Sequence, residues 1–128
     1  GGAGGDTLDG VAGSDTLTGA AGADIFAFTA ALNATTNSDV ITDFSVVDDT
    51  IRLENAIFTK FTATGALPAG SFISGPGAVA LDGNDHLIYN TTTGTLAYDT
   101  DGNGAGAQVV FATLTGTPAL TQADFVVV

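Results

Sequence analysis

The first 27 residues place one large hydrophobic residue at every ninth position, within a stretch rich in glycine and aspartate. The hydrophobic positions are Leu8, Leu17 and Phe26. Beyond them, residues 38–53 alternate between apolar and polar side chains, which is typical of strands. No segment has a convincing amphipathic helical pattern, although a short helical turn is possible near 29–34 or 119–123. The pattern therefore predicts an all-β protein.

The second half of the chain contains further short strand candidates separated by turn residues. The run TTTG at 91–94 predicts a hairpin turn, and residues 54–77 have an irregular pattern. The strand candidates are residues 78–81, 86–90, 95–99, 108–114 and 124–128.

The opening stretch divides into three segments of nine residues: GGAGGDTLD, GVAGSDTLT and GAAGADIFA. Each begins with Gly and carries Asp at its sixth position, at Asp6, Asp15 and Asp24. A glycine turn followed by a three-residue strand accounts for nine residues, because glycine tolerates the positive φ that such a turn needs. Two segments would form one coil of a flattened parallel solenoid. Residues eighteen apart would then stack about 4.8 Å from one another.

This register predicts which side chains share a sheet. Leu8 and Phe26 should face inward from one sheet and Leu17 from the other. Asp6 should lie beneath Asp24, with Asp15 on the opposite edge. Asp9 is expected to be an ordinary strand residue. The second glycine of the turn is replaced by Val11 and by Ala20, and a β-branched residue is disfavoured at positive φ.

The net charge of the chain indicates a cation as its binding partner. The formal net charge is −12 over 128 residues, and Arg52 and Lys60 are the only basic residues. Such a chain is poorly suited to nucleic acid or to an anionic membrane surface. Thirteen of the fourteen acids are Asp, whose short carboxylate suits hard cations. Stacked carboxylates repel one another, and Ca²⁺ with about six to eight oxygen ligands would relieve that repulsion.

The repeat resembles the RTX, or hemolysin-type, calcium-binding repeats of bacterial secreted proteins. The resemblance implies that Ca²⁺ binds between a turn and the turn two repeats later, through backbone carbonyls and both aspartates. One implied ligand set comprises Gly1, Ala3, Asp6, Ala20, Gly22 and Asp24. The set on the opposite edge begins with Gly10, Ala12 and Asp15.

Residues 38–53 resemble the segment that follows such repeats in serralysin-type proteases. The motif reads Asp39-Val40-Ile41-Thr42-Asp43-Phe44, then Asp49-Thr50-Ile51-Arg52-Leu53. Asp39 and Asp43 are candidates to complete the site begun by Asp15; the alternative is that they are ordinary turn acids.

Residues 78–128 resemble the C-terminal region of RTX proteins exported by type I secretion. The final DFVVV resembles the acidic and hydrophobic terminus of those substrates. The absence of Met and the start within a glycine pattern predict a C-terminal fragment of a longer protein. In this fragment residues 1–53 would form a parallel β-roll with closing strands. Residues 54–128 would form an antiparallel, β-sandwich-like C-terminal cap that carries the secretion signal.

Another possible calcium site lies at 99–104, where Asp-Thr-Asp-Gly-Asn-Gly matches the first half of an EF-hand loop. Its candidate ligands are Asp99, Asp101 and Asn103. Val110 stands where the bidentate acid of that loop belongs, so a polar turn is the alternative. Residues 82–85 are expected to be a solvated hairpin turn.

The sequence does not indicate catalysis. His86 is the single histidine, cysteine is absent, and no serine has a nucleophile-elbow context. The expected function is calcium-dependent folding after export, with Ca²⁺ and the type I exporter as partners and a secreted or cell-surface location. The alternative is a calcium-stabilised adhesin or polysaccharide-binding module of a larger secreted protein, with glycan binding or self-association.

Overall fold

The structure is a computed structural model that describes residues 1–68 and 70–128. These residues form short β-strands and a single turn of 3₁₀ helix, η1 (Gln122–Asp124), so the expected all-β class is confirmed. No described helix has the length and apolar character required to cross a membrane. The strands are β1 (Thr7–Asp9), β2 (Thr16–Leu17), β3 (Ile25–Phe28), β4 (Asp39–Ile41), β5 (Thr50–Leu53), β6 (Gly65–Ala66), β7 (Phe72–Gly75), β8 (Leu87–Asn90), β9 (Thr95–Tyr98), β10 (Val109–Leu114) and β11 (Phe125–Val127).

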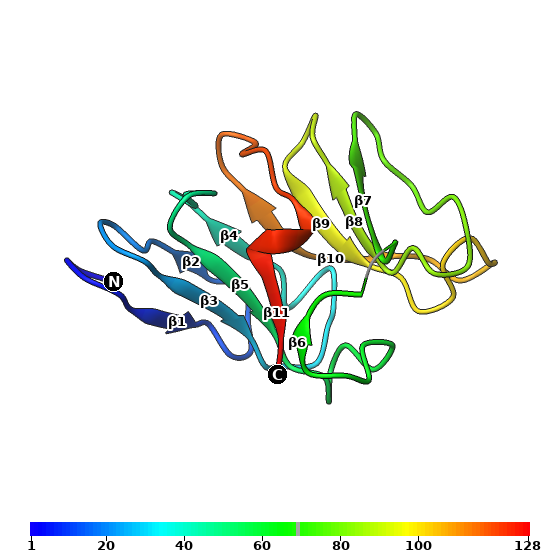
Figure 1. Cartoon of the computed structure of the whole chain (residues 1–128), viewed down its shortest axis with the longest axis horizontal. Coiled ribbons are helices and arrows are strands. Elements are labelled where there is room, and N and C mark those ends of the chain that lie inside the picture. The colour runs from blue at the N-terminus through cyan, green and yellow to red at the C-terminus, as the bar shows by residue number, and fades with distance from the viewer. Residues whose placement is uncertain (69) are drawn as a thin grey trace.

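The strands form two mixed, open sheets. The first has the order β1-β3-β5-β11-β6 and the second has the order β2-β4-β10-β9-β8-β7. Figure 1 shows β1, β3, β5 and β11 side by side in the first sheet. These four strands are parallel, and β6 is antiparallel to β11. From β1 to β5 the chain alternates between the two sheets.

The register agrees with the eighteen-residue spacing that the sequence predicts. Thr7 pairs with Ile25 and Leu8 pairs with Phe26 across β1 and β3. The turns stack as well, because the Gly4 N–H donates to the Ala21 carbonyl at 2.8 Å. Leu17 lies on the other sheet and pairs with Ile41. The hydrophobic residue of each segment therefore reaches the sheet that the repeat assigned to it.

The core lies between the two sheets. Phe28 of β3 packs edge-on against Phe111 of β10, with ring centroids 5.0 Å apart. Leu8 is half-buried because β1 is the edge strand of its sheet. Both buried tyrosines satisfy their hydroxyls, as Tyr89 donates to the Pro118 carbonyl at 2.7 Å and Tyr98 accepts from the Lys60 N–H at 2.9 Å.

The C-terminal half differs from the expected antiparallel cap. β8, β9 and β10 are antiparallel, and residues 91–94 connect β8 to β9 as the hairpin prediction required. However, β7 is parallel to β8, β10 is parallel to β4, and β11 is parallel to β5. The open edges of β4 and β5 need backbone partners, and β10 and β11 supply them.

Local predictions in this half had mixed outcomes. Residues 78–81 are not a strand, whereas β7 and β6 lie in the stretch expected to be irregular. Ala69, in that stretch, lies outside the described residues. The helical turn expected at 119–123 corresponds to η1, and the one expected at 29–34 does not form. The division at residue 53 stays a prediction, and both sheets contain strands from its two sides.

The buried position of Phe26 gives a stability prediction. Phe26→Ala should lower the free energy of unfolding by about 3–5 kcal/mol, because a fully buried phenylalanine leaves a cavity. Val47→Ala should change it by less than about 0.5 kcal/mol, since Val47 is 86% exposed. Urea denaturation of both variants in buffer with excess CaCl₂ would measure the difference. Equal losses would contradict the inward orientation of Phe26.

Candidate metal centre

Three glycine turns, residues 1–6, 10–15 and 19–24, each end in an aspartate that directly precedes a strand. Because β1 pairs with β3, the first and third turns stack on one edge of the molecule. Asp24 accepts the Asp6 N–H through Oδ1 at 2.9 Å. On the opposite edge, Asp39 accepts the Asp15 N–H through Oδ1 at 2.9 Å. The structure therefore brings Asp6 to Asp24, as the repeat predicts, and Asp39 to Asp15, for which the segment after the repeat offered it as one of two candidates.

The first row of aspartates extends one layer further than expected. Asp49 accepts the Asp24 N–H through Oδ1 at 2.9 Å, and its other oxygen accepts the Ser45 N–H at 2.8 Å. Asp49 precedes β5 just as Asp24 precedes β3. Sequence reasoning did not assign Asp49 as a ligand, although an aspartate directly before a Thr-Ile strand start repeats the pattern of Asp6 before Thr-Leu. Asp6, Asp24 and Asp49 thus form one row of carboxylates.

The expected first ligand set lies on two stacked turns. Ala3 forms a parallel bridge with Ala21, which stands between Ala20 and Gly22. The Gly1 amino group donates to the carbonyl of Thr18, the residue just before the third turn, at 2.5 Å. A Cβ on Gly22 would collide with the backbone of Gly4, so only glycine permits this approach. The two turns that contain the six implied ligand residues are thereby held against each other at one edge.

Burial makes these carboxylates costly without a counterion. Asp24 is 1% exposed, Asp39 4% and Asp49 6%. An ionised carboxylate removed from water is strongly unfavourable unless it is paired or binds a metal. For Asp39, burial is the main cause that raises its pKa above the ordinary value. The negative charges of Asp15 and Asp9 raise it further, against the lowering effect of the Asp15 N–H.

Two carboxylate oxygens are unused within the described part of the chain. Oδ2 of Asp15 and Oδ2 of Asp24 are buried and have no hydrogen-bond partner there. Each lies against the first glycine of its own turn, since a Cβ on Gly10 would stand 2.6 Å from Asp15 Oδ2 and a Cβ on Gly19 would also collide with Asp24 Oδ2. Buried, unpaired anionic oxygens are hard donors of the kind that fits Ca²⁺.

Asp43 is not placed beside Asp15. Its carboxylate accepts the Gly19 N–H at 2.9 Å and the Ala20 N–H at 2.7 Å, on the edge formed by the first and third turns. The reason is strand length: four residues of extended chain span about 13 Å. The chain that leaves Asp39 through β4 therefore reaches the opposite edge at Asp43. Gly10 and Ala12 remain in the second turn with Asp15.

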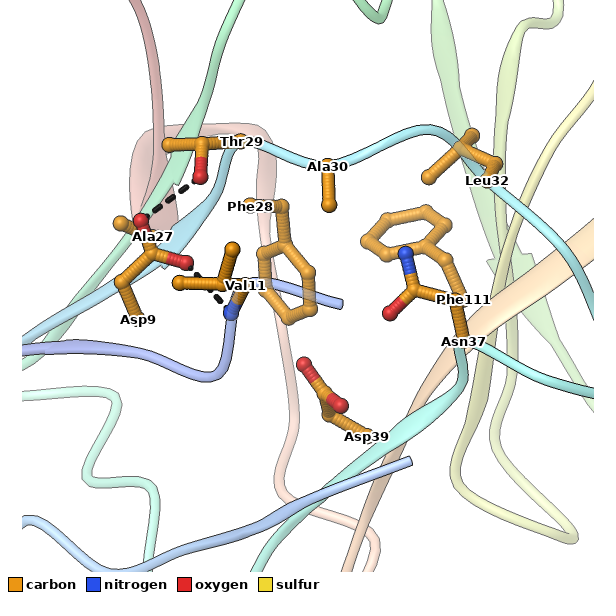
Figure 2. A pocket seen from close by; sticks show the side chains of 10 residues that line it. All are labelled: Asp9, Val11, Ala27, Phe28, Thr29, Ala30, Leu32, Asn37, Asp39 and Phe111. Carbon is orange, nitrogen blue, oxygen red and sulfur yellow. Dashed lines mark hydrogen bonds between the residues drawn. The ribbon is translucent and has the colours of Figure 1, made fainter. Parts of the chain in front are cut away.

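A small cavity of about 10 Å³ lies near Asp39. Figure 2 shows the Asp39 carboxylate pointing toward it, with Asp9, Val11 and Asn37 around it. The figure also shows Asp9 held by two hydrogen bonds, from the Val11 N–H at 2.9 Å and from the Thr29 hydroxyl at 2.7 Å. Asp9 is therefore more than the plain strand residue that the sequence suggested.

The candidate loop at 99–104 closes largely on its own backbone. Asp99 accepts the Asp101 N–H at 3.2 Å, and Asp101 accepts the Gly106 N–H at 2.7 Å. Burial, together with the Asp101 carboxylate, raises the pKa of Asp99, and the Gly106 N–H lowers that of Asp101. The Asn103 amide donates instead to the Leu81 carbonyl at 3.2 Å. These contacts are those of a polar turn, and they do not direct Asn103 toward the two acids.

Residues 82–85 form a turn with residues 82–84 exposed, as the sequence suggested, but the turn is not a hairpin. They lie between β7 and β8, which are parallel. Asp85 is buried and accepts the N–H groups of Leu81 and Asp82. The Asp82 carbonyl accepts the Asn103 N–H at 3.0 Å, so this turn packs against the 99–104 loop.

Side chains alone do not form a metal centre in the residues described: no group of three or more His, Cys, Asp or Glu is placed to hold a metal ion. The implied sites need only two carboxylates each, because carbonyls supply the remaining oxygens. Comparison with known proteins gives no match, either to a protein-family model or to a curated protein. The geometry of the turns is therefore the basis for the functional proposal.

The glycine contacts yield a prediction about the second turn. Gly10→Ala should destabilise the protein by about 1–3 kcal/mol, because the new methyl group would overlap Asp15 Oδ2. Gly2→Ala is the matched control, since a Cβ there would meet nothing within 4 Å. Thermal unfolding of both variants by circular dichroism would compare them. A Gly10→Ala variant as stable as Gly2→Ala would contradict the proximity of Asp15 to the turn backbone.

Proposed function

We propose that the glycine repeat is a short parallel β-roll of the RTX type, that it binds Ca²⁺, and that the chain folds on Ca²⁺ after export by a type I secretion system. The observation that carries this proposal is the pair of buried, unpaired oxygens, Asp15 Oδ2 and Asp24 Oδ2, within stacked aspartates. In this view the residues beyond the roll form a C-terminal cap whose strands β10 and β11 extend the two sheets.

The residues proposed to hold Ca²⁺ lie on both edges of the roll. On one edge they are Gly1, Ala3, Asp6, Ala20, Gly22 and Asp24, with Asp49 extending the row. On the other edge they are Gly10, Ala12, Asp15 and Asp39. When bound, Ca²⁺ would supply positive charge between like-charged layers and accept carbonyl and carboxylate oxygens. The role of this chain is non-catalytic in the proposal.

The stacked carboxylates explain why folding should depend on the cation. Asp6, Asp24 and Asp49 occupy successive layers of a parallel sheet, which are about 4.8 Å apart. Their repulsion adds to the large conformational entropy that glycine loses on folding. Ca²⁺ that binds the folded chain and not the unfolded chain adds stability by mass action. Extracellular sites with Kd of roughly 10⁻⁴–10⁻³ M are sufficient for such a switch.

The burial of β11 supports export before folding. Residues 124–128 resemble the terminus of type I substrates, yet Phe125 and Val127 are buried. β11 is paired on both sides, with β5 and with β6. An exporter that recognises this segment would need it unpaired, which requires the unfolded chain. The proposed partners are therefore Ca²⁺ outside the cell and the exporter during translocation.

The glycan-binding alternative has weaker structural support. Sugar rings usually stack on exposed aromatic faces, and tyrosine and phenylalanine are the aromatic residues of this chain. Tyr89 and Tyr98 are both buried in the core. Neither presents a ring to solvent. An alginate pull-down would test this alternative directly.

Our main prediction concerns Ca²⁺ itself. After treatment with EDTA, far-UV circular dichroism should show little strand signal, and titration with CaCl₂ should restore it. MgCl₂ should be much less effective, because Mg²⁺ demands a tighter octahedral geometry and gives up its water reluctantly. A chain that keeps its full strand signal in EDTA and ignores Ca²⁺ would contradict calcium-gated folding.

A second prediction locates the binding groups. Asp24→Asn should raise the calcium midpoint of that titration about tenfold, because it removes the charge from the buried, unpaired oxygen. Asp48→Asn removes the same formal charge from an exposed side chain and should have little effect. Indistinguishable midpoints for the two variants would argue against Asp24 as a ligand.

A further inference from the structure

We infer that Asp9 and Asp43 are positioning residues that hold two of the glycine turns in a conformation with a free carboxylate oxygen. The inference rests on the proposed function and adds two acids to it that would not contact the cation themselves. Three linked observations support it. The second residue of two turns has positive φ, its N–H donates to an acid outside the turn, and the aspartate of the turn itself keeps an unpaired oxygen.

The first observation is the conformation of the second residue of the turn. Val11 has φ of 63° and Ala20 has φ of 73°. Both lie in the left-handed region that favours glycine, and a side chain there is strained, above all the β-branched side chain of Val11. Such residues persist only where surrounding contacts determine the conformation.

The second observation supplies those contacts. The Val11 N–H donates to Asp9 Oδ1 at 2.9 Å, and the Ala20 N–H donates to Asp43 Oδ2 at 2.7 Å. Both acids are anchored by another contact. Asp9 accepts the Thr29 hydroxyl through its other oxygen, as Figure 2 shows. Asp43 accepts the Gly19 N–H through Oδ1, so it binds two consecutive N–H groups of the third turn.

The first turn provides an internal contrast. Its second residue is Gly2, which is outside the positive-φ region. The Gly2 N–H donates to Asp6 Oδ2, the aspartate of its own turn, at 2.6 Å. In this turn the carboxylate oxygen is therefore engaged by the backbone.

The third observation follows from this contrast. In the second and third turns the equivalent N–H is taken by Asp9 and by Asp43. The Oδ2 atoms of Asp15 and Asp24 consequently lack a hydrogen-bond partner among the described residues, although both are buried. Asp9 and Asp43, which lie outside these turns, thus accept the N–H of the second turn residue. Asp15 and Asp24 each keep one carboxylate oxygen that is available to the cation.

This arrangement accounts for the replacement of glycine in these two turns. Glycine reaches positive φ at little cost, so a turn with glycine at its second position needs less external support. Where Val11 and Ala20 stand, a charge-assisted hydrogen bond to a neighbouring carboxylate stabilises the positive-φ conformation, which Gly2 of the first turn does not adopt. The requirement for Asp43 should therefore weaken when Ala20 is changed to Gly.

The test is a double-mutant comparison at the third turn. Asp43→Ala should raise the calcium midpoint of folding about tenfold, because two hydrogen bonds to a charged acceptor are lost. Ala20→Gly in the Asp43→Ala background should recover most of that loss, because glycine holds the positive φ at position 20 without support from the acid. The Ala20→Gly single variant, measured alongside, completes the cycle. Asp48→Ala, which removes an exposed acid five residues further on, controls for net charge.

Amide hydrogen exchange provides a second measurement of the third turn that does not depend on the affinity for Ca²⁺. Amide hydrogen exchange at saturating Ca²⁺ should show a protected Ala20 N–H in the unchanged protein and in Asp48→Ala. In Asp43→Ala that protection should fall at least about tenfold, because its acceptor is gone.

The outcomes separate the inference from the function on which it rests. An unchanged protein that does not respond to Ca²⁺ would overturn both. A normal response, with Asp43→Ala matching Asp48→Ala in midpoint and in Ala20 exchange, would overturn the inference alone. A raised midpoint that Ala20→Gly does not recover would show that Asp43 acts through its charge or as a ligand, and would also overturn the positioning role.

Discussion

The fold depends on a hydrogen bond that recurs between stacked layers, in which a buried aspartate accepts the N–H of the aspartate one coil away. Asp24 accepts from Asp6, Asp49 accepts from Asp24, and Asp39 accepts from Asp15. Each bond fixes the register of a parallel strand pair at the point where the strands begin. It also places carboxylates of the same sign close together in a region from which water is excluded. The interaction that defines the register therefore creates a demand for positive charge.

The glycines at the first position of each turn, and two acids outside the turns, keep carboxylate oxygens available for such a positive charge. First-position glycines leave room for Oδ2 of Asp15 and Asp24, which a Cβ would obstruct. Asp9 and Asp43 satisfy the neighbouring backbone N–H groups. In the second and third turns, an acid from outside the turn accepts the backbone N–H of the second residue. The Oδ2 atom of the turn's own aspartate therefore stays unpaired. Stability, register and proposed metal binding are properties of the same few atoms.

The C-terminal half completes the sheets that the repeat begins. β10 and β11 pair in parallel with β4 and β5, and the aromatic contact of Phe28 with Phe111 joins the two halves through the core. The last strand, β11, is enclosed between β5 and β6. In the folded chain the segment that resembles a secretion signal is therefore part of the sheet, which couples its accessibility to folding.

The sequence by itself determined the β class, the eighteen-residue register and the inward positions of Leu8, Leu17 and Phe26, because these follow from a nine-residue repeat and local glycine chemistry. It also determined the pairing of Asp6 with Asp24, and Asp39 was among its candidate partners for Asp15. Only the tertiary structure decided that Asp43 reaches the third turn, that Asp49 extends the row, and that the C-terminal strands pair in parallel with β4 and β5. These features depend on where the chain crosses from one sheet to the other and on which open edges need partners. Such long-range choices leave no periodic signal in the sequence.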